Sequence, residues 1–142
     1  GKVSNRNLGI GCVAFVLANG WIPWVEVDGQ SPGNANQWDD KARAFAAAHP
    51  EYGVVVDKNP SPGAIMVHNG GGGGYGHVGI VSEVYDGNSF QVQAGDTWAA
   101  GKTAGWGEWY NSQGQLNTAN VYNDTVSDDV YFIHLPWVEA SY

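Results

Sequence analysis

The chain has 142 residues, with six Lys and Arg against 14 Asp and Glu, so its formal net charge at pH 7 is −8. A surface this acidic repels the phosphates of nucleic acids and anionic lipid headgroups, and we expect neither nucleic acid nor membrane as a partner. Hydrophobic residues make up 43% of the sequence, yet no apolar run comes near the roughly 20 residues that cross a bilayer. These totals predict one globular domain over residues 1–142 with a single core.

The first predicted element is a short buried helix that begins near Cys12. The run CVAFVLA is apolar on all sides, and Asn19-Gly20 is typical of a left-handed helix end. A second helix is predicted between the turn-rich stretch GQSPGNAN and Pro50, with Asn34 or Asn36 as its cap. Its apolar residues and one histidine recur at helical spacing, at Trp38, Ala42, Phe45, Ala46 and His49.

The second half of the chain has the pattern of a sheet. From Gly53 onward the hydrophobic period changes to two, with β-branched residues in GVVV, AIMV, HVGIVSEVY, SFQVQA and DVYFIHL. The section 99–123 is rich in Gly, Trp and Asn, and we expect long loops around short strands there. Because helices come first and an antiparallel sheet follows, the predicted fold class is α+β.

Cys12 is the one cysteine of the chain, and it stands where the first helix begins. A single cysteine cannot close an internal disulfide and is too few for a cysteine-based zinc site. It is therefore a buried small residue, a tether to another chain, or a nucleophile. The free N–H groups of a helix N-terminus stabilise a thiolate. For Cys12 alone, however, burial is the simpler interpretation, because unpaired cysteines are among the most buried residues.

His77 is the candidate partner of this thiol. It opens the strand HVGIVSEVY directly after the glycine-rich loop NGGGGGYG, where a ligand could approach the backbone. A lone histidine in such a place is more often a surface residue. The catalytic interpretation therefore needs a residue on the next strand that orients the imidazole.

The turn that follows this strand supplies a candidate. Asp86-Gly87 favours a two-residue hairpin turn, in which Tyr85 faces Asn88. Pairing continued outward from that turn puts His77 opposite Asp96. A carboxylate there would fix the ring tautomer and stabilise the imidazolium. A three- or four-residue loop would shift the facing residue by one or two positions.

Aromatic residues are the candidates for substrate binding: Trp38, Tyr75 and Trp98. Trp98 lies in loop-rich sequence just past Asp96, where an indole face can stack on a sugar ring or close over a peptide. Packing under long loops explains Trp98 equally well. For Trp38, a position in the core is the favoured interpretation.

A metal site is the alternative chemistry. His68 and His134 lie in strand patterns, and with His77 and Asp96 they could supply three ligands of a hydrolytic zinc ion. The sequence contains none of the compact two-histidine signatures of such sites. We therefore predict no metal and no cofactor.

Five motifs, in order along nearly the whole chain, carry a resemblance: GCVAFVLANG, PGNANQW, PSPGAIMV, YGHVGIVSEV and FIHL. Together they resemble the CHAP domain, a family of cysteine, histidine-dependent amidohydrolases and peptidases that cut bacterial peptidoglycan. The resemblance implies a papain-like fold, with N-terminal helices packed on a C-terminal antiparallel sheet. It also implies Cys12 as nucleophile and His77 as general base and acid.

Several positions depart from the family pattern. The residue before the nucleophile is usually Gln, which can help bind the oxyanion, and here it is Gly11. The strand after the histidine strand often carries Glu and, two positions on, Asn; those positions are Ala94 and Asp96. The resemblance thus also implies Asp96 as the orienting residue. Some CHAP domains bind calcium through an acidic loop before the nucleophile, but GKVSNRN has no carboxylate and we expect no calcium there.

We therefore predict a cysteine hydrolase of peptidoglycan, either an N-acetylmuramoyl-L-alanine amidase or a stem or cross-bridge endopeptidase. The alternatives are a zinc-dependent wall amidase and a non-catalytic glycan-binding module. Residues 1–15 lack the pattern of a signal peptide, so the chain is expected to be intracellular or a piece of something longer. The resemblance implies a monomer that is secreted or delivered to the bacterial wall, as a phage lysin or a wall hydrolase. Because walls are often anionic, we expect a separate wall-targeting module in the parent protein.

Overall fold

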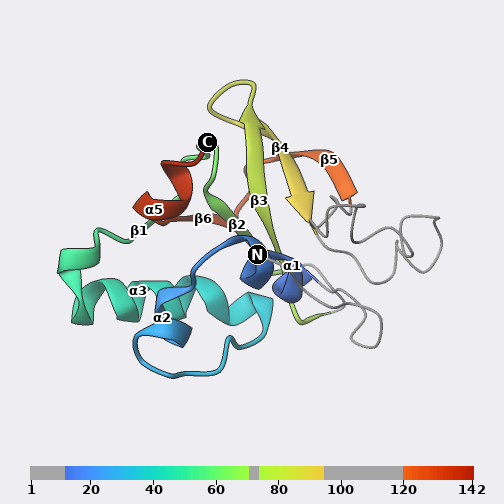
Figure 1. Cartoon of the computed structure of the whole chain (residues 1–142). Coiled ribbons are helices and arrows are strands. Elements are labelled where there is room, and N and C mark those ends of the chain that lie inside the picture. Colours follow the sequence, from blue (N-terminus) through green and yellow to red (C-terminus); the bar gives the residue numbers. More distant parts are fainter. Residues whose placement is uncertain (1–11, 71–73, 95–119) are drawn as a thin grey trace, which may run out of the picture.

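The computed structural model describes residues 12–70, 74–94 and 120–142 (Figure 1). Most of the described helical elements precede the strands, as predicted. They are α1 (Cys12–Asn19), α2 (Pro23–Glu26), the 3-10 helix η1 (Ala35–Gln37), α3 (Trp38–Ala48), the 3-10 helix η2 (Pro50–Tyr52) and, after the last strand, α5 (Pro136–Glu139). No helix in these ranges is long and apolar enough to cross a membrane.

α1 begins at Cys12 and ends at Asn19, but it does not end as predicted. Neither Asn19 nor Gly20 has a positive φ, so the expected left-handed end is wrong. Instead the Gly20 N–H donates to the Val16 carbonyl at 2.8 Å, and Asn19 Nδ2 donates to the Phe15 carbonyl at 2.8 Å. The Asn19 side chain thus bonds back to the carbonyl four residues earlier, in the last turn of the helix.

The sheet has six strands in the described part of the chain, and every pair of neighbours is antiparallel. The strands are β1 (Val55–Asp57), β2 (Ile65–His68), β3 (His77–Val84), β4 (Ser89–Ala94), β5 (Asn120–Thr125) and β6 (Val130–His134). Their order in the sheet is β1-β6-β2-β3-β4-β5. The α+β class is therefore confirmed.

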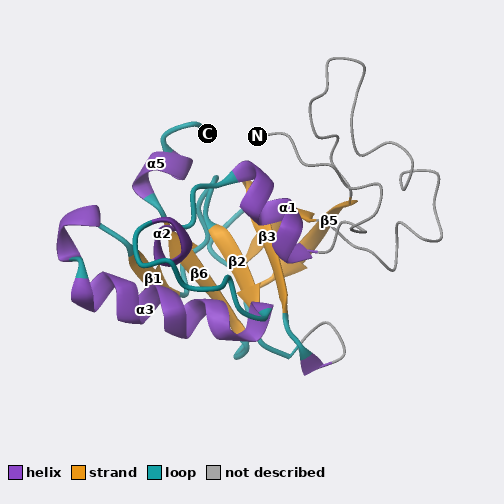
Figure 2. Cartoon of the chain, turned by 60° about the horizontal axis from the view of Figure 1, so that its bottom comes forward, coloured by secondary structure: helices purple, strands orange, loops and turns teal. Residues whose placement is uncertain are grey.

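The helices pack on the sheet through an apolar core. Figure 2 shows α1 and α3 across one face of the sheet, where α1 contacts β3 and β4 and α3 contacts β1 and β6. The largest side chains of this layer are Trp24 and Trp38, which are both fully buried and meet edge to face at 5.1 Å between ring centroids. A second core cluster includes Phe90 and Phe132, whose ring centroids are 5.1 Å apart. The burial of apolar surface in both clusters supplies the main stabilisation of the sheet.

The hairpin between β3 and β4 corrects the predicted turn. Tyr85 does not face Asn88, because its N–H donates to the carbonyl of Ser89 at 3.0 Å, which lengthens the loop by one residue. The Asp86 carboxylate accepts hydrogen bonds from the N–H groups of Asn88 and Ser89 at 2.7 and 2.8 Å, and these bonds lower the pKa of Asp86. This local bonding by aspartate stabilises the longer turn.

A β-bulge then restores the predicted register. β3 and β4 shift relative to each other between Val81 and Glu83, so that Ser82 is the extra residue on β3. Beyond the bulge, Ile80 faces Gln93 and Val81 faces Val92. These are the pairs that a two-residue turn would have produced. The longer turn shifts the pairing of β3 with β4 by one residue, and the bulge shifts it back. In the half of β3 nearer His77, the observed pairs are therefore the predicted ones.

Candidate active site

Cys12 is the first residue of α1, and its side chain is half-buried against the core beneath the helices. The first turn of α1 contains no acidic residue, so nothing in that turn offsets the partial positive charge of the helix start. α1 packs on β3, the strand that begins with His77 (Figures 1 and 2). The two candidate residues therefore begin two elements that are in contact.

His77 is half-buried at the start of β3, with an imidazole opposite it on the adjacent strand β2 and a phenol ring near it on β5, two strands away in the sheet. On β2 it is paired in register with His68, and its ring centroid lies 6.1 Å from that of Tyr122 on β5. Nδ1 of His68 is buried without a hydrogen-bond partner among the described residues. The sequence patterns placed His68 on a strand but did not reveal that it faces His77. The strand patterns AIMVH and HVGI lie on either side of one loop, so an antiparallel pairing of the two would have placed His68 opposite His77.

The backbone before His77 is held by η1. The Asn36 N–H donates to the Tyr75 carbonyl at 2.9 Å, and Asn36 Nδ2 donates to the Gly74 carbonyl at 3.0 Å. Gly76 is buried here with a φ of 82°, and a Cβ at this residue would come within 2.8 Å of the Asn36 Cα. Only glycine allows this close approach in this conformation. Asn36, which the sequence suggested as a helix cap, thus fixes where β3 begins.

The aromatic candidates differ in their surroundings. Tyr75 is 68% exposed, two residues before His77. Trp38 is fully buried, and its Nε1 donates to the Gly33 carbonyl at 3.2 Å, so it packs in the core instead of lining an open groove. Trp98 and the proposed orienting residue Asp96 lie outside the described residues. Ala94, at the family's usual Glu position, is the buried last residue of β4.

His134 belongs to a different part of the fold. It ends β6, next to β1 and α5, where Nε2 lies 2.7 Å from Asp57 Oδ1 and Nδ1 lies 2.8 Å from Glu139 Oε2. The Ser61 hydroxyl lies 3.0 Å from the same Nδ1 and donates to Glu139 Oε1 at 2.6 Å. Both ring nitrogens of His134 therefore have partners within the fold, and His134 is not part of the candidate active site. Among the described residues, no three His, Cys, Asp or Glu side chains are grouped so that they could hold a metal ion.

Replacing His134 with alanine is expected to lower the free energy of unfolding by about 2–3 kcal/mol, because the carboxylates of Asp57 and Glu139 would lose their common partner. Urea unfolding measures this loss. His49 offers a comparison: it contacts one carboxylate, Asp28, at 3.0 Å. His49→Ala is therefore expected to cost about 1 kcal/mol or less. Equal losses in the two variants would contradict the role given to His134.

A family model described as CHAP domain matches residues 2–96, which is more than half of the chain. The chain belongs to the CHAP domain family. The resemblance inferred from the five sequence motifs is therefore confirmed, and membership supports a peptidoglycan amidase or peptidase in general.

Among solved structures, this CHAP domain is similar to an N-acetylmuramoyl-L-alanine amidase from Staphylococcus aureus. The two are 18% identical, with a TM-score of 0.45, over 75% of this chain and 25% of that chain. The CHAP domain thus spans about a quarter of the length of that structure. No curated protein sequence matches it.

Proposed function

We propose that this CHAP domain is a cysteine hydrolase that cleaves amide bonds in bacterial peptidoglycan, with Cys12 as the nucleophile and His77 as general base and acid. The match to the family over residues 2–96 carries the proposal. The contact between α1 and β3 supports it, because these elements begin with the two reactive residues.

The reaction that we propose has two steps. The Cys12 thiolate attacks the amide carbonyl carbon, and His77 gives a proton to the nitrogen as the C–N bond breaks, which leaves a thioester and a free amine. His77 then takes a proton from water, whose oxygen attacks the thioester carbon and releases the carboxylic acid and the Cys12 thiolate, so that thiolate and protonated His77 are restored for the next turnover. Backbone N–H groups at the start of α1, including that of Cys12, are suited to bind the oxyanion, because they point along the positive end of the helix dipole.

Asp96 is the proposed orienting residue of His77. The prediction depends on a register in which Ile80 faces Gln93, and those two residues are paired. Tyr75 and Trp98 are the proposed substrate contacts, and the exposure of Tyr75 beside the start of β3 supports its part. The proposed setting is that of a monomer, secreted or delivered to the wall as part of a phage lysin or wall hydrolase, with a separate module for wall targeting.

Digestion of purified peptidoglycan tests the function. We expect soluble fragments whose release stops after treatment with iodoacetamide and continues in the presence of a chelator, because a thiol and not a metal is the proposed nucleophile. Mass spectrometry of the fragments separates the two proposed bonds: an amidase frees the sugar from the first alanine, and an endopeptidase cuts within the peptides. Inhibition by the chelator alone would favour a zinc amidase, and binding without any fragments would favour a glycan-binding module. Either result would overturn the proposal.

A further inference from the structure

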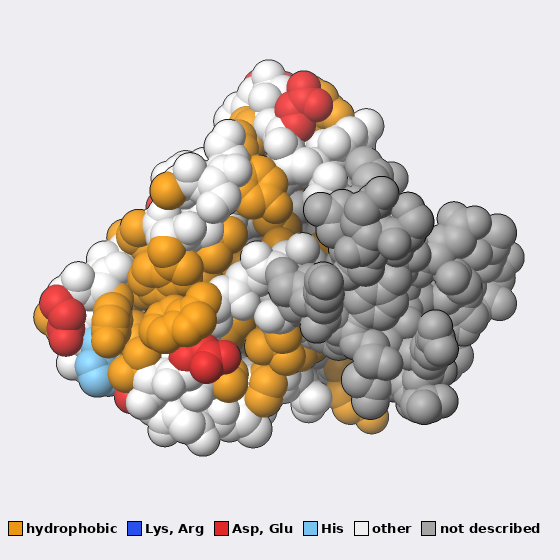
Figure 3. Space-filling view, in the orientation of Figure 1, with side chains coloured by type: hydrophobic (Ala, Val, Ile, Leu, Met, Phe, Trp, Pro, Cys, Tyr) orange, Lys and Arg blue, Asp and Glu red, His pale blue; other side chains and the backbone are white. Residues whose placement is uncertain are grey.

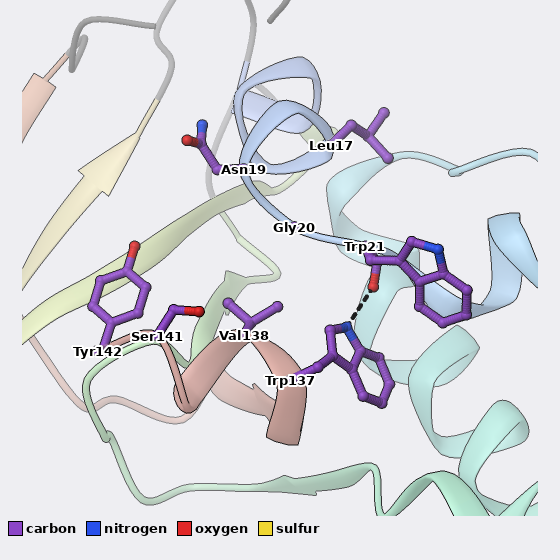
Figure 4. Close-up of a pocket in the computed structure, with 8 residues that line it drawn as sticks. All are labelled: Leu17, Asn19, Gly20, Trp21, Trp137, Val138, Ser141 and Tyr142. Atoms are coloured by element: carbon purple, nitrogen blue, oxygen red, sulfur yellow. Dashed lines mark hydrogen bonds between the residues drawn. The ribbon is translucent and has the colours of Figure 1, made fainter. Parts of the chain in front are cut away.

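A pocket of about 420 Å³ lies at the other end of α1, between the C-terminal end of that helix and α5 (Figure 4). Cys12 is the first residue of α1, whereas the pocket is lined by residues near the other end of the helix and just past it, from Leu17 to Trp21. At about 1.5 Å per residue, a helix of this length separates its two ends by roughly 10 Å. The pocket is thus distinct from the candidate active site, and its volume lies within the range of small-molecule sites.

Exposed aromatic rings flank this pocket on two sides. Trp21 is 44% exposed and Tyr142 is 55% exposed, although large aromatic side chains are commonly buried. In the face that Figure 3 shows, hydrophobic side chains gather over α5 and the segment that links α1 to α2. An aromatic ring with one face open to solvent can stack on the apolar face of a sugar ring.

Both rings are held in place by their neighbours. The Trp137 indole meets that of Trp21 edge to face at 5.5 Å, and its Nε1 donates to the Trp21 carbonyl at 2.9 Å (Figure 4). The Tyr142 ring lies over Gly63, where a Cβ would come within 2.9 Å of a ring carbon. Rings fixed in this way lose little conformational entropy when a ligand binds.

The polar side chains that the structure describes in the pocket are uncharged. Asn19 donates its amide N–H to the Phe15 carbonyl, which leaves its side-chain oxygen as an acceptor. Ser141 and Tyr142 add hydroxyl groups, and burial raises the pKa of the Tyr142 hydroxyl above its usual value. Among the residues that the structure describes, no Lys, Arg, Asp or Glu side chain lines the pocket. With a net charge of −8 on the whole chain, these groups favour a neutral ligand that is rich in hydroxyl and amide groups.

We propose that this pocket binds a neutral N-acetylated hexosamine unit of a glycan strand, with Trp21 stacked on the sugar ring. Val138 offers apolar surface for the acetyl methyl group, and Asn19 offers an acceptor for the amide N–H (Figure 4). The choice of this sugar rests on the proposed function, because peptidoglycan strands consist of N-acetylated hexosamines. A site at the far end of α1 would hold the strand without charge attraction while an amide bond is cut at Cys12, and so would raise the effective concentration of substrate.

The test measures binding in the Cys12→Ala chain, so that turnover plays no part. Chitotetraose, a neutral tetramer of N-acetylglucosamine, is titrated by calorimetry, with maltotetraose as the control sugar. We expect chitotetraose alone to bind, and Trp21→Ala to weaken it by about tenfold, as loss of one stacked ring implies. Tyr142→Ala should also weaken it, because the Tyr142 ring and hydroxyl line the pocket. Tyr85 is also an exposed aromatic residue, at 49%, but lies on the β3–β4 hairpin. Tyr85→Ala should therefore bind like the parent chain.

The outcomes separate this inference from the proposed function. Absence of chitotetraose binding, equal binding of maltotetraose, or unchanged affinity in both Trp21→Ala and Tyr142→Ala would overturn the sugar site, even if the native chain digests peptidoglycan. Binding that shows the expected pattern, in a chain whose native form releases no fragments, would overturn the hydrolase and keep the site. Circular dichroism of each variant identifies a loss of fold, and Tyr142→Ala keeps the test open if Trp21→Ala fails to fold.

Discussion

Cys12→Ala is expected to lower the rate of peptidoglycan hydrolysis by about 10⁴-fold or more, because it removes the atom that attacks the amide. Cys12→Ser is expected to lose nearly as much, since a hydroxyl in the same place is far harder to ionise than a thiol. His77→Ala should lower the rate by a similar factor. Because nucleophile and base act as a unit, the double variant should be no slower than either single variant.

Stability measurements separate this catalytic loss from unfolding. Cys12 is half-buried, so its replacement by alanine removes little packing, and we expect the free energy of unfolding to change by about 1 kcal/mol or less. His49→Ala is the control for His77→Ala, because His49 is also a partly exposed histidine, at the end of α3. It should retain the parent rate. Full activity in Cys12→Ala would refute the thiol mechanism, and full activity in His77→Ala would refute the assigned base.

The parts of the fold that the sequence predicted well are those set by local hydrophobic pattern. α1 begins at Cys12 and α3 ends just before Pro50, because apolar periodicity and proline act over a few residues. The hairpin shows the limit of local reasoning. Bonding by the Asp86 carboxylate lengthened the turn, and the bulge at Ser82 restored the register, and neither feature has a clear pattern in the sequence.

The candidate site shows a second limit, since its positioning residues act through contacts that are remote along the chain. His68 became a neighbour of His77 only through the pairing of β2 with β3. The sequence suggested Asn36 as a helix cap, yet its side chain donates a hydrogen bond to Gly74, which lies 38 residues further along the chain. In the sequence, the glycine-rich loop before His77 indicated only a place where a ligand could approach the backbone. One of its glycines, Gly76, instead meets a steric requirement that only the folded chain creates.

Gly76→Ala is expected to be the most damaging change outside the reactive residues. At a φ of 82°, a side chain costs about 1–3 kcal/mol in backbone strain. In addition, the new Cβ would overlap the backbone of Asn36, so either η1 or the start of β3 must move. We expect a total loss of about 3 kcal/mol in the free energy of unfolding. The rate of hydrolysis should also fall by about 100-fold, because displacing a catalytic group by about 1 Å has an effect of that size.

Gly74→Ala separates strain from overlap. Gly74 also has a positive φ, of 99°, but no atom of the described residues lies within 4 Å of the position that its Cβ would take. This variant should therefore show the loss of stability from strain alone, with the parent rate of hydrolysis, when urea unfolding and peptidoglycan digestion are measured side by side. If Gly74→Ala and Gly76→Ala lose stability and activity equally, the contact with Asn36 does not position His77. If only Gly76→Ala loses activity, the packing of η1 against this loop is what places the imidazole at the start of β3.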